Sequence, residues 1–361
     1  MKNNASNETL VYHGGATNAE KIFATTAYTI IFPIALVGNF LAIYIVFRKR
    51  YMRSVTNMLL VNMFVGNFLV AFVAMPYSVA YIYLRNPWFE GVVGSLTCKL
   101  IHFAYVLPIA ASIFALLLSS IDRYFAVIYP FKQLQFICNA RASTIFIWLS
   151  SSICMSPYLY MFTSTLMKDG NYYCIIDWSP LDTVKSSKIF YLTIFFLLYI
   201  IPLLVIASLY LMIGLKLWNR KIPGNVLVNV TRAADKAKKK VVKMLLIVVV
   251  VFAVSWIPAH TMHMMIYFNA ELYRQIPRLV SIMAFWTCHA NSAISPFLFL
   301  FMSEKFRSEL LAIFKERSAS EKASVMRRTY NYKITSISRN NSASKSSSRS
   351  SAKKEYETTT L

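Results

Sequence analysis

The chain has 361 residues, of which 57% are hydrophobic and 15% charged, and its mean hydropathy is +0.49. A chain of this length with so few charges is too apolar for a soluble globular protein, so that class is excluded and a bilayer protein is expected. The formal net charge of +23 would suit nucleic acid. However, the basic residues gather in particular loops, as membrane topology requires, and we expect no nucleic-acid partner.

Seven uncharged intervals follow one another along the chain. Each is longer than the roughly 20 residues that cross a hydrocarbon core as a helix, so each predicts one membrane span. The intervals are 22–47, 54–84, 100–121, 142–167, 189–215, 244–270 and 279–303. The predicted fold is an all-α membrane protein, a seven-transmembrane helix bundle over 22–303, followed by a short amphipathic helix.

Residues 1–21 form a polar segment before the first span and contain no apolar core of a cleavable signal peptide. Basic residues cluster after the first span, around the loop after the third and before the sixth, whereas the loops 168–188 and 271–278 mix signs. The positive-inside rule then places the amino terminus outside the cell and the carboxy terminus in the cytoplasm. Sequons at Asn4 and Asn7 would lie in an extracellular tail, where we expect glycosylation.

Two of the five cysteines fall on the outer, oxidising side of this topology. Cys98 begins the third span and Cys174 lies in the second outer loop, so we expect a disulfide between them, the alternative being two free thiols. Cys138, Cys154 and Cys288 are expected to be unpaired core or interface residues.

After the last span, the chain changes character twice. Over 304–317 the apolar residues Phe306, Leu310, Ile313 and Phe314 share one helical face, which predicts a helix on the inner membrane surface. Residues 318–361 are rich in Ser, Lys and Arg, and this composition predicts a disordered cytoplasmic tail. The tail ends in Thr359-Thr360-Leu361, which could add a strand to a PDZ domain with Leu361 in its pocket.

Polar and aromatic residues form stripes along three of the spans, because they recur at three- and four-residue steps. Aromatics and imidazoles converging near the outer half would make a pocket, and Pro258 and Pro296 would let a helix bend. The alternative is packing between helices with no ligand, since the same residue types also join membrane helices. The stripes are Tyr105, Ile109, Ser112, Leu116, Ser119 and Arg123; Phe252, Trp256, His260, His263 and Tyr267; and Phe285, His289, Ser292, Pro296 and Phe299.

Short motifs also follow a fixed order along the spans. They are Gly38-Asn39, Asp122-Arg123-Tyr124, Trp148, the pair Cys98 and Cys174, Pro202 with Tyr210, FAVSWIP ending at Pro258, and NSAISPFLF before the amphipathic helix. Together they resemble the rhodopsin-like G-protein-coupled receptors over roughly residues 22–316. The resemblance implies a multi-pass plasma-membrane receptor that binds an extracellular ligand and activates a heterotrimeric G protein. It implies no enzyme, and we expect no cofactor and no metal-ligand set.

The same resemblance assigns roles to residues of the switch. Asp122 would hold Arg123 at the cytoplasmic rim in the resting state. On activation the sixth helix would swing outward and Arg123 would meet the carboxy-terminal helix of the G protein. A ligand drives this change through its differential affinity for the two states. The implied switch residues are Asp122, Arg123, Tyr124, Tyr210, Phe252, Trp256, Pro258, Pro296 and Phe299.

The resemblance also narrows the ligand class. Amine receptors carry an Asp where this chain has Tyr105, and opsins need a seventh-span Lys, which is missing between Arg278 and Glu304. Pro258-Ala259-His260 matches the proline-x-histidine of neuropeptide receptors and favours the neuropeptide Y, tachykinin and galanin branch. Asp177 in the outer loop would be available to a basic ligand residue. The candidate ligand contacts are Tyr77, Tyr81, Tyr105, Asp177, His260, His263, Tyr267 and Phe285.

The chain departs from the family pattern at Asn67, at Ser295 and Phe299, and at Lys238. The usual Asn-Pro-x-x-Tyr motif of the family is here Ser-Pro-Phe-Leu-Phe. Asn67 replaces a carboxylate that in the family helps bind sodium together with a serine, here Ser112, so we expect little sodium effect. Phe299 lacks the hydroxyl that in the family reaches through water toward Tyr210. Lys238 stands where some relatives place an acid that holds Arg123, so we expect appreciable basal signalling.

The predicted tail adds two expectations. It contains no cysteine, so a palmitate anchor is not expected. Its Ser and Thr clusters resemble sites for receptor kinases and hence arrestin, although a solvated low-complexity tail has the same composition.

Three other functions are alternatives to a peptide receptor. A lipid receptor of the same fold stays open, because the pocket stripe is largely aromatic. A transporter or channel would show ionisable residues at mid-membrane and inverted repeats, which the sequence lacks. A non-signalling scavenger is disfavoured by the intact Asp122-Arg123-Tyr124 motif.

Overall fold

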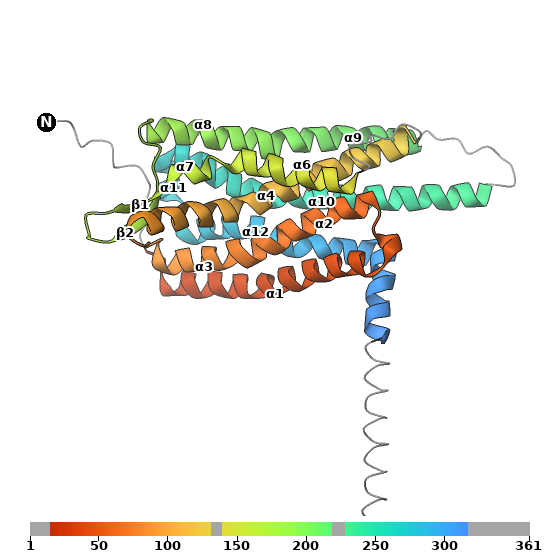
Figure 1. The fold of residues 1–361 in the computed structure, drawn as a ribbon, viewed down its shortest axis with the longest axis horizontal. Coiled ribbons are helices and arrows are strands. Elements are labelled where there is room, and N and C mark those ends of the chain that lie inside the picture. Colours follow the sequence, from red (N-terminus) through yellow and green to blue (C-terminus); the bar gives the residue numbers. More distant parts are fainter. Residues whose placement is uncertain (1–14, 131–138, 219–227, 317–361) are drawn as a thin grey trace, which may run out of the picture. The chain divides into compact units, whose positions relative to one another are not determined.

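The computed structural model describes residues 15–130, 139–218 and 228–316, apart from the side chains of 228–238 and 241. It divides into a large unit, Met1–Phe306, and a second unit, Arg307–Leu361. In the large unit, long helices run side by side as a bundle (Figure 1). The predicted glycosylation sites Asn4 and Asn7, the tail 318–361 and Cys138 lie outside the described residues.

The helices follow the seven predicted intervals in order. Six of them are long and apolar enough to cross a membrane, and the seventh, α12, contains polar residues such as His289 and Ser292 that lower its hydropathy. The bundle consists of α1 (Asn18–Arg48), α2 (Val55–Leu69) with η2 (Val70–Ala74) and α3 (Met75–Leu84), α4 (Gly91–Ile128), α6 (Ala140–Met155) with α7 (Tyr158–Met161), α8 (Thr183–Phe195) with η3 (Phe196–Ile200) and α9 (Ile201–Trp218), α10 (Val228–Phe268), and α12 (Arg278–Met302). Two short helices, η1 (Arg50–Met52) and α11 (Ala270–Gln275), and a helix over 304–316 complete the described helices.

Two helices are interrupted by one π-helical turn each. The turn η2 lies between α2 and α3, and η3 lies between α8 and α9. A π turn is a local widening of an α-helix that commonly marks functional sites. Both turns separate the part of a helix that lies away from the cavity described below from the part that lines it.

Capping side chains mark where several helices begin. Thr17 and Glu20 form a capping box at α1, in which the Glu20 carboxylate accepts from the Thr17 backbone N–H at 2.8 Å. Asn139 caps α6, and Asp182 caps α8 by accepting from the Lys185 N–H at 2.7 Å. Several helices therefore extend beyond the uncharged intervals, which mark only their apolar portions.

The first and last helices of the bundle approach closely. A Cβ added at Gly38 in α1 would lie 2.9 Å from the Pro296 Cγ in α12, so the absence of a side chain allows this contact. In addition, α1 packs along α2, and α4 contacts α2, α6 and α9. The helix α4 is thus the central element of the bundle.

The prediction of a single span over 142–167 is wrong at its carboxy-terminal end. There, residues Phe162–Leu166 form strand β1, which pairs antiparallel with β2 (Tyr172–Ile176), Ser164 opposite Cys174. The β-branched Thr163 and Thr165 favour a strand, and pairing with β2 satisfies the backbone outside the helix. Figure 1 shows this hairpin at the same end of the bundle as α11.

Candidate functional site

A cavity of about 450 Å³ opens among the helices. It is lined by residues of α1, α3, α4, α8, α10 and α12 and by part of β2. The structure therefore brings together side chains that are distant in sequence. Seven of the eight predicted ligand contacts line the cavity: Tyr77, Tyr81, Tyr105, His260, His263, Tyr267 and Phe285.

Asp177, the eighth predicted contact, does not line the cavity. Its carboxylate accepts from the Ser179 backbone N–H at 2.9 Å and from the Thr183 hydroxyl at 3.5 Å. These local bonds hold the turn that precedes α8. The carboxylate expected to meet a basic ligand residue thus has a structural role in its own loop.

Stacked rings form one wall of the cavity. Tyr191 of α8 stacks on Tyr267 of α10 with centroids 4.2 Å apart, and on His263 at 5.1 Å. Phe285 of α12 meets His263 edge-on at 5.1 Å. Ring contacts therefore connect α8, α10 and α12 directly, and a ligand between them would contact all three helices.

A second aromatic group lies deeper along α10. The ring of His260 packs on Tyr199 at 4.5 Å and on Trp256 at 5.7 Å, and Trp256 in turn packs on Phe252 at 5.9 Å. The Tyr199 hydroxyl donates to the Ala253 carbonyl at 2.8 Å. Since Trp256 and His260 line the cavity and Phe252 lies below them, the group extends from the cavity toward the inner part of α10.

A buried histidine of the cavity lining links α1, α4 and α12. The Nδ1 of His289 lies 2.9 Å from the Tyr28 hydroxyl, and its Nε2 lies 2.8 Å from the Tyr105 hydroxyl. A neutral imidazole donates from one nitrogen and accepts at the other, so this pair of hydroxyls satisfies it completely. The sequence places His289 on its stripe, but nothing in it identified Tyr28 as the partner on α1.

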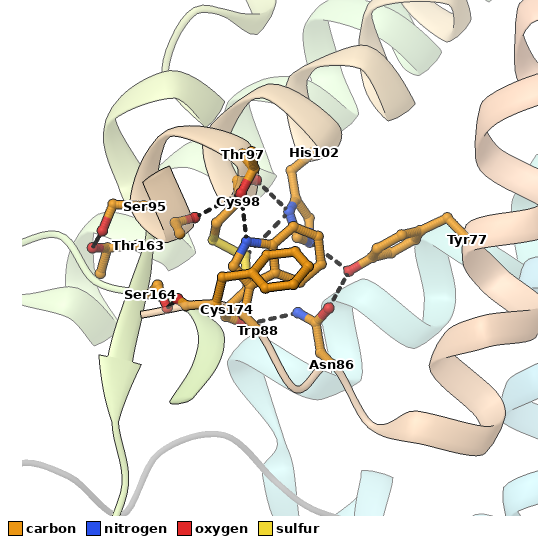
Figure 2. The surroundings of a disulfide bond; sticks show 12 residues. Tyr77, Asn86, Trp88, Ser95, Thr97, Cys98, His102, Thr163, Ser164 and Cys174 are labelled. Carbon is orange, nitrogen blue, oxygen red and sulfur yellow. Dashed lines mark hydrogen bonds between the residues drawn. A yellow bond between two sulfur atoms is a disulfide. The ribbon is translucent and has the colours of Figure 1, made fainter. Parts of the chain in front are cut away.

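The predicted disulfide between Cys98 and Cys174 is confirmed, with Cα atoms 5.7 Å apart (Figure 2). His102 lies beside it. The ring stacks on Phe162 at 3.7 Å and its Nδ1 donates to the Cys98 carbonyl at 2.8 Å. The two sulfurs are close to the His102 ring, but a disulfide offers no thiolate to a metal ion.

Hydrogen bonds extend from this disulfide to the cavity wall (Figure 2). The Tyr77 hydroxyl lies 2.9 Å from the His102 Nε2 and 2.8 Å from the Asn86 Oδ1, and the Asn86 amide donates to the Cys174 carbonyl at 2.7 Å. With the His102 proton on Nδ1, both atoms facing Tyr77 are acceptors. The single hydroxyl proton therefore serves one of them at a time.

At the other end of α4, Arg123 is held by two residues. It pairs with Asp122 at 2.5 Å, and its guanidinium also donates to the Thr56 hydroxyl of α2. The Thr56 hydroxyl in turn donates to Asp122 at 2.7 Å. Thr56 was not among the predicted switch residues.

The remaining predicted switch residues lie near this end or within the helices. Tyr210 meets the Ser120 hydroxyl of α4 at 3.2 Å, and Tyr124 packs on Tyr129 at 5.9 Å. Phe299 is fully buried, edge-on to Phe64 at 5.2 Å. The Phe299 ring therefore makes an apolar contact at the position where the family has a hydroxyl that binds water. Pro258 lies inside α10 and Pro296 inside α12.

A second, smaller cavity of about 30 Å³ lies between the large one and Arg123. Its polar lining comprises Asn67, Ser112, Asn291, Ser292 and Ser295 as well as His289. The Asn67 amide nitrogen and the Asn291 amide oxygen are buried without a hydrogen-bond partner among the described residues. The volume suits one or two waters, and no described carboxylate lines it. The donor set therefore does not fit the sodium ion that the resemblance implies.

Comparison with known proteins identifies the family. Residues 38–299 match the family model of the 7 transmembrane receptor (rhodopsin family). The chain belongs to this family. It is 29% identical to the substance-P receptor of Cavia porcellus over 288 residues, covering 78% of this chain and 68% of the relative. It is likewise 29% identical to the substance-K receptor of Canis lupus familiaris over 294 residues, covering 80% and 74%.

Family membership confirms several predictions. The chain is a rhodopsin-like G-protein-coupled receptor, a multi-pass plasma-membrane protein with an all-α bundle, and not an enzyme. The transporter or channel alternative is thereby excluded. The similarity to receptors named for substance P and substance K agrees with the predicted neuropeptide Y, tachykinin and galanin branch.

Proposed function

We propose that this receptor binds an extracellular peptide in the 450 Å³ cavity and responds by activating a heterotrimeric G protein. The observation that carries the proposal is the convergence of seven predicted contacts on one cavity. The names of the relatives support a peptide rather than a lipid ligand. The lining, with several tyrosines and imidazoles, offers hydrogen bonds that a peptide backbone can use.

In this proposal the ligand acts on α10. A ligand that contacts His260, His263 and Trp256 binds better to one position of that helix than to another, and the difference in affinity shifts the equilibrium between them. The inner end of α10 then moves outward, and Arg123 exchanges Asp122 and Thr56 for the G protein. The amino terminus is extracellular and the carboxy terminus cytoplasmic. Receptor kinases, arrestin and a PDZ domain at Leu361 are proposed partners of the tail.

The test is a G-protein dissociation assay against a neuropeptide library, in cells that express the intact receptor or the Arg123→Ala variant at equal surface level. We expect a peptide response that disappears in the variant. Alanine at Tyr105 or His260 should lower the potency of that peptide. Unchanged potency in both alanine variants would show that the peptide does not bind in this cavity. A response to lipids alone would show that the ligand is a lipid and not a peptide.

The orientation is tested separately by epitope tags. A tag at the amino terminus should bind antibody on intact cells, and a tag at the carboxy terminus only after permeabilisation. The opposite pattern would contradict the proposed topology.

A further inference from the structure

The charges around the large cavity have one sign. Among the described residues that line it, the charged ones are Arg85 and Arg278, and no Asp or Glu is present. The other polar groups are hydroxyls, amides and imidazoles. A cation buried in such a cavity would have no carboxylate to pair with, whereas an anion would meet two guanidinium groups.

The backbone around Arg85 fixes its place at the cavity. Arg85 ends α3 in the left-handed region with φ of 57°, and Asn86 follows with φ of 69°. Two successive left-handed residues without glycine are uncommon and mark a site under constraint. Asn86 is held by Tyr77 and by the carbonyl of Cys174 (Figure 2). The turn that carries Arg85 is thus anchored to the disulfide and its loop.

Five of the outer carboxylates have other roles. Glu90 accepts from the Tyr172 hydroxyl at 3.1 Å, and Asp169 accepts from the Tyr173 hydroxyl at 2.9 Å. Asp177 holds its own turn, and Asp182 caps α8. Glu20 caps α1 and lies within electrostatic range of Arg278. None of the five lines the cavity, and none forms an ion pair with Arg85.

We propose that the ligand of this receptor is an acidic peptide, whose carboxylate is recognised by Arg85 and Arg278 at the cavity wall. The inference rests on the proposed peptide-receptor function and adds the charge of the ligand. Arginine suits the task because its planar guanidinium binds a carboxylate through two parallel hydrogen bonds. The test centres on Arg85, because Asn86 beside it anchors the turn to the Cys174 carbonyl.

The test uses three pools of short synthetic peptides with identical apolar and aromatic positions. The variable positions carry Asp and Glu in one pool, Asn and Gln in the second, and Lys and Arg in the third. The readout is Arg123-dependent G-protein dissociation at matched surface expression. We expect the acidic pool to act at a concentration at least about tenfold lower than the amide pool.

Variants locate the origin of that preference. Arg85→Gln should bring the acidic and amide pools to within about threefold of each other, and Arg85→Glu should favour the basic pool. Arg274→Gln is the control, since Arg274 is exposed on α11 and does not line the cavity. It should leave the preference intact.

The outcomes separate this inference from the function on which it rests. Responses without preference for acid, or an acid preference that survives both Arg85→Gln and Arg278→Gln, overturn the acidic ligand and leave the peptide receptor standing. If a long-chain fatty acid activates the receptor and Arg85→Gln abolishes that response, recognition of an anionic ligand stands, but the ligand is not a peptide. Silence of every pool contradicts the peptide receptor itself, and the acidic ligand falls with it.

Discussion

Thr56 contacts two switch residues, although the sequence did not predict it as a member of the switch. Its hydroxyl bridges Asp122 and Arg123 from the neighbouring helix. A hydrogen bond to a charged group contributes about 1.5–3 kcal/mol. If a variant loses about 1.4 kcal/mol of this stabilisation in the resting state and none in the active state, the ratio of active to resting receptor rises about tenfold.

We therefore expect Thr56→Val to raise basal signalling several-fold at equal surface expression. The control is Thr29→Val, because the Thr29 hydroxyl donates only within its own helix, to the Thr25 carbonyl at 2.8 Å. Equal basal signals in Thr56→Val and the intact receptor would show that this bridge does not hold Arg123.

Asn67 offers a gain-of-function test at the small cavity. The family's carboxylate is replaced there by an amide, and the Asn67 side chain lies 3.4 Å from the Ser112 hydroxyl. Asn67→Asp supplies the missing charge and hard-oxygen ligand for sodium. Agonist affinity of the variant should fall when sodium replaces a bulky organic cation at constant ionic strength, and that of the intact receptor should change little.

Adding Ser112→Ala to the Asn67→Asp variant should weaken the sodium effect, since one ligand oxygen is lost. A sodium effect of similar size in the intact receptor would contradict the reading of this cavity as a neutral, water-binding site.

Among the elements, α1, α4 and α12 are joined by a single imidazole. In His289→Phe, both hydrogen bonds of the imidazole are lost: the buried Tyr28 hydroxyl loses this partner and the Tyr105 hydroxyl keeps Ser78 at 3.3 Å. A buried group left unsatisfied costs about 1–3 kcal/mol. The thermal midpoint of the detergent-solubilised receptor should fall further than in Tyr28→Phe, which removes one hydroxyl together with its bond. Equal midpoints for the two variants would mean that the imidazole does not bridge the helices.

The inner end of α10 has an ion pair of its own. Lys240 meets Glu304 at 2.5 Å, although both side chains are largely exposed. Exposed pairs are worth about 0–1 kcal/mol, so the effect is small. Outward movement of α10 would carry Lys240 away from Glu304, so Lys240→Glu should raise basal signalling up to about fivefold. The double exchange Lys240→Glu with Glu304→Lys should restore it, and its failure to do so would exclude the pair.

For the whole molecule, the bond between Cys98 and Cys174 closes a separation of 76 residues. Removing a native disulfide typically costs about 2–5 kcal/mol. Cys98→Ser should therefore lower both thermal stability and ligand potency, since the β hairpin and the Asn86 turn depend on the same loop. Cys154→Ser is the control, because Cys154 is a free thiol. A Cys98→Ser receptor with normal potency would show that the loop is held without the bond.

The bundle could be predicted from the sequence because each membrane span requires a long uncharged, apolar interval. Uncharged intervals located the helices, and the spacing of Tyr105, His260 and Phe285 placed them on facing stripes. Partners such as Tyr28 and His289, 261 residues apart, leave no periodic signal. Asp177 lies outside the cavity lining, because an acid in a loop is readily used by its own turn. The β1 strand was missed because the uncharged interval continues through it.

The two π turns have a consequence for how receptors of this kind diverge. In an α-helix each residue adds a rotation of about 100°. Loss of a single residue within η2 would turn Tyr77 and Tyr81 away from the cavity, while Thr56 and Asn67 on the inner side would keep their register. The same holds for η3 and Tyr191. Insertion or deletion of a single codon at these turns can therefore change ligand preference during evolution. The residues around Arg123 that we propose meet the G protein would stay unchanged.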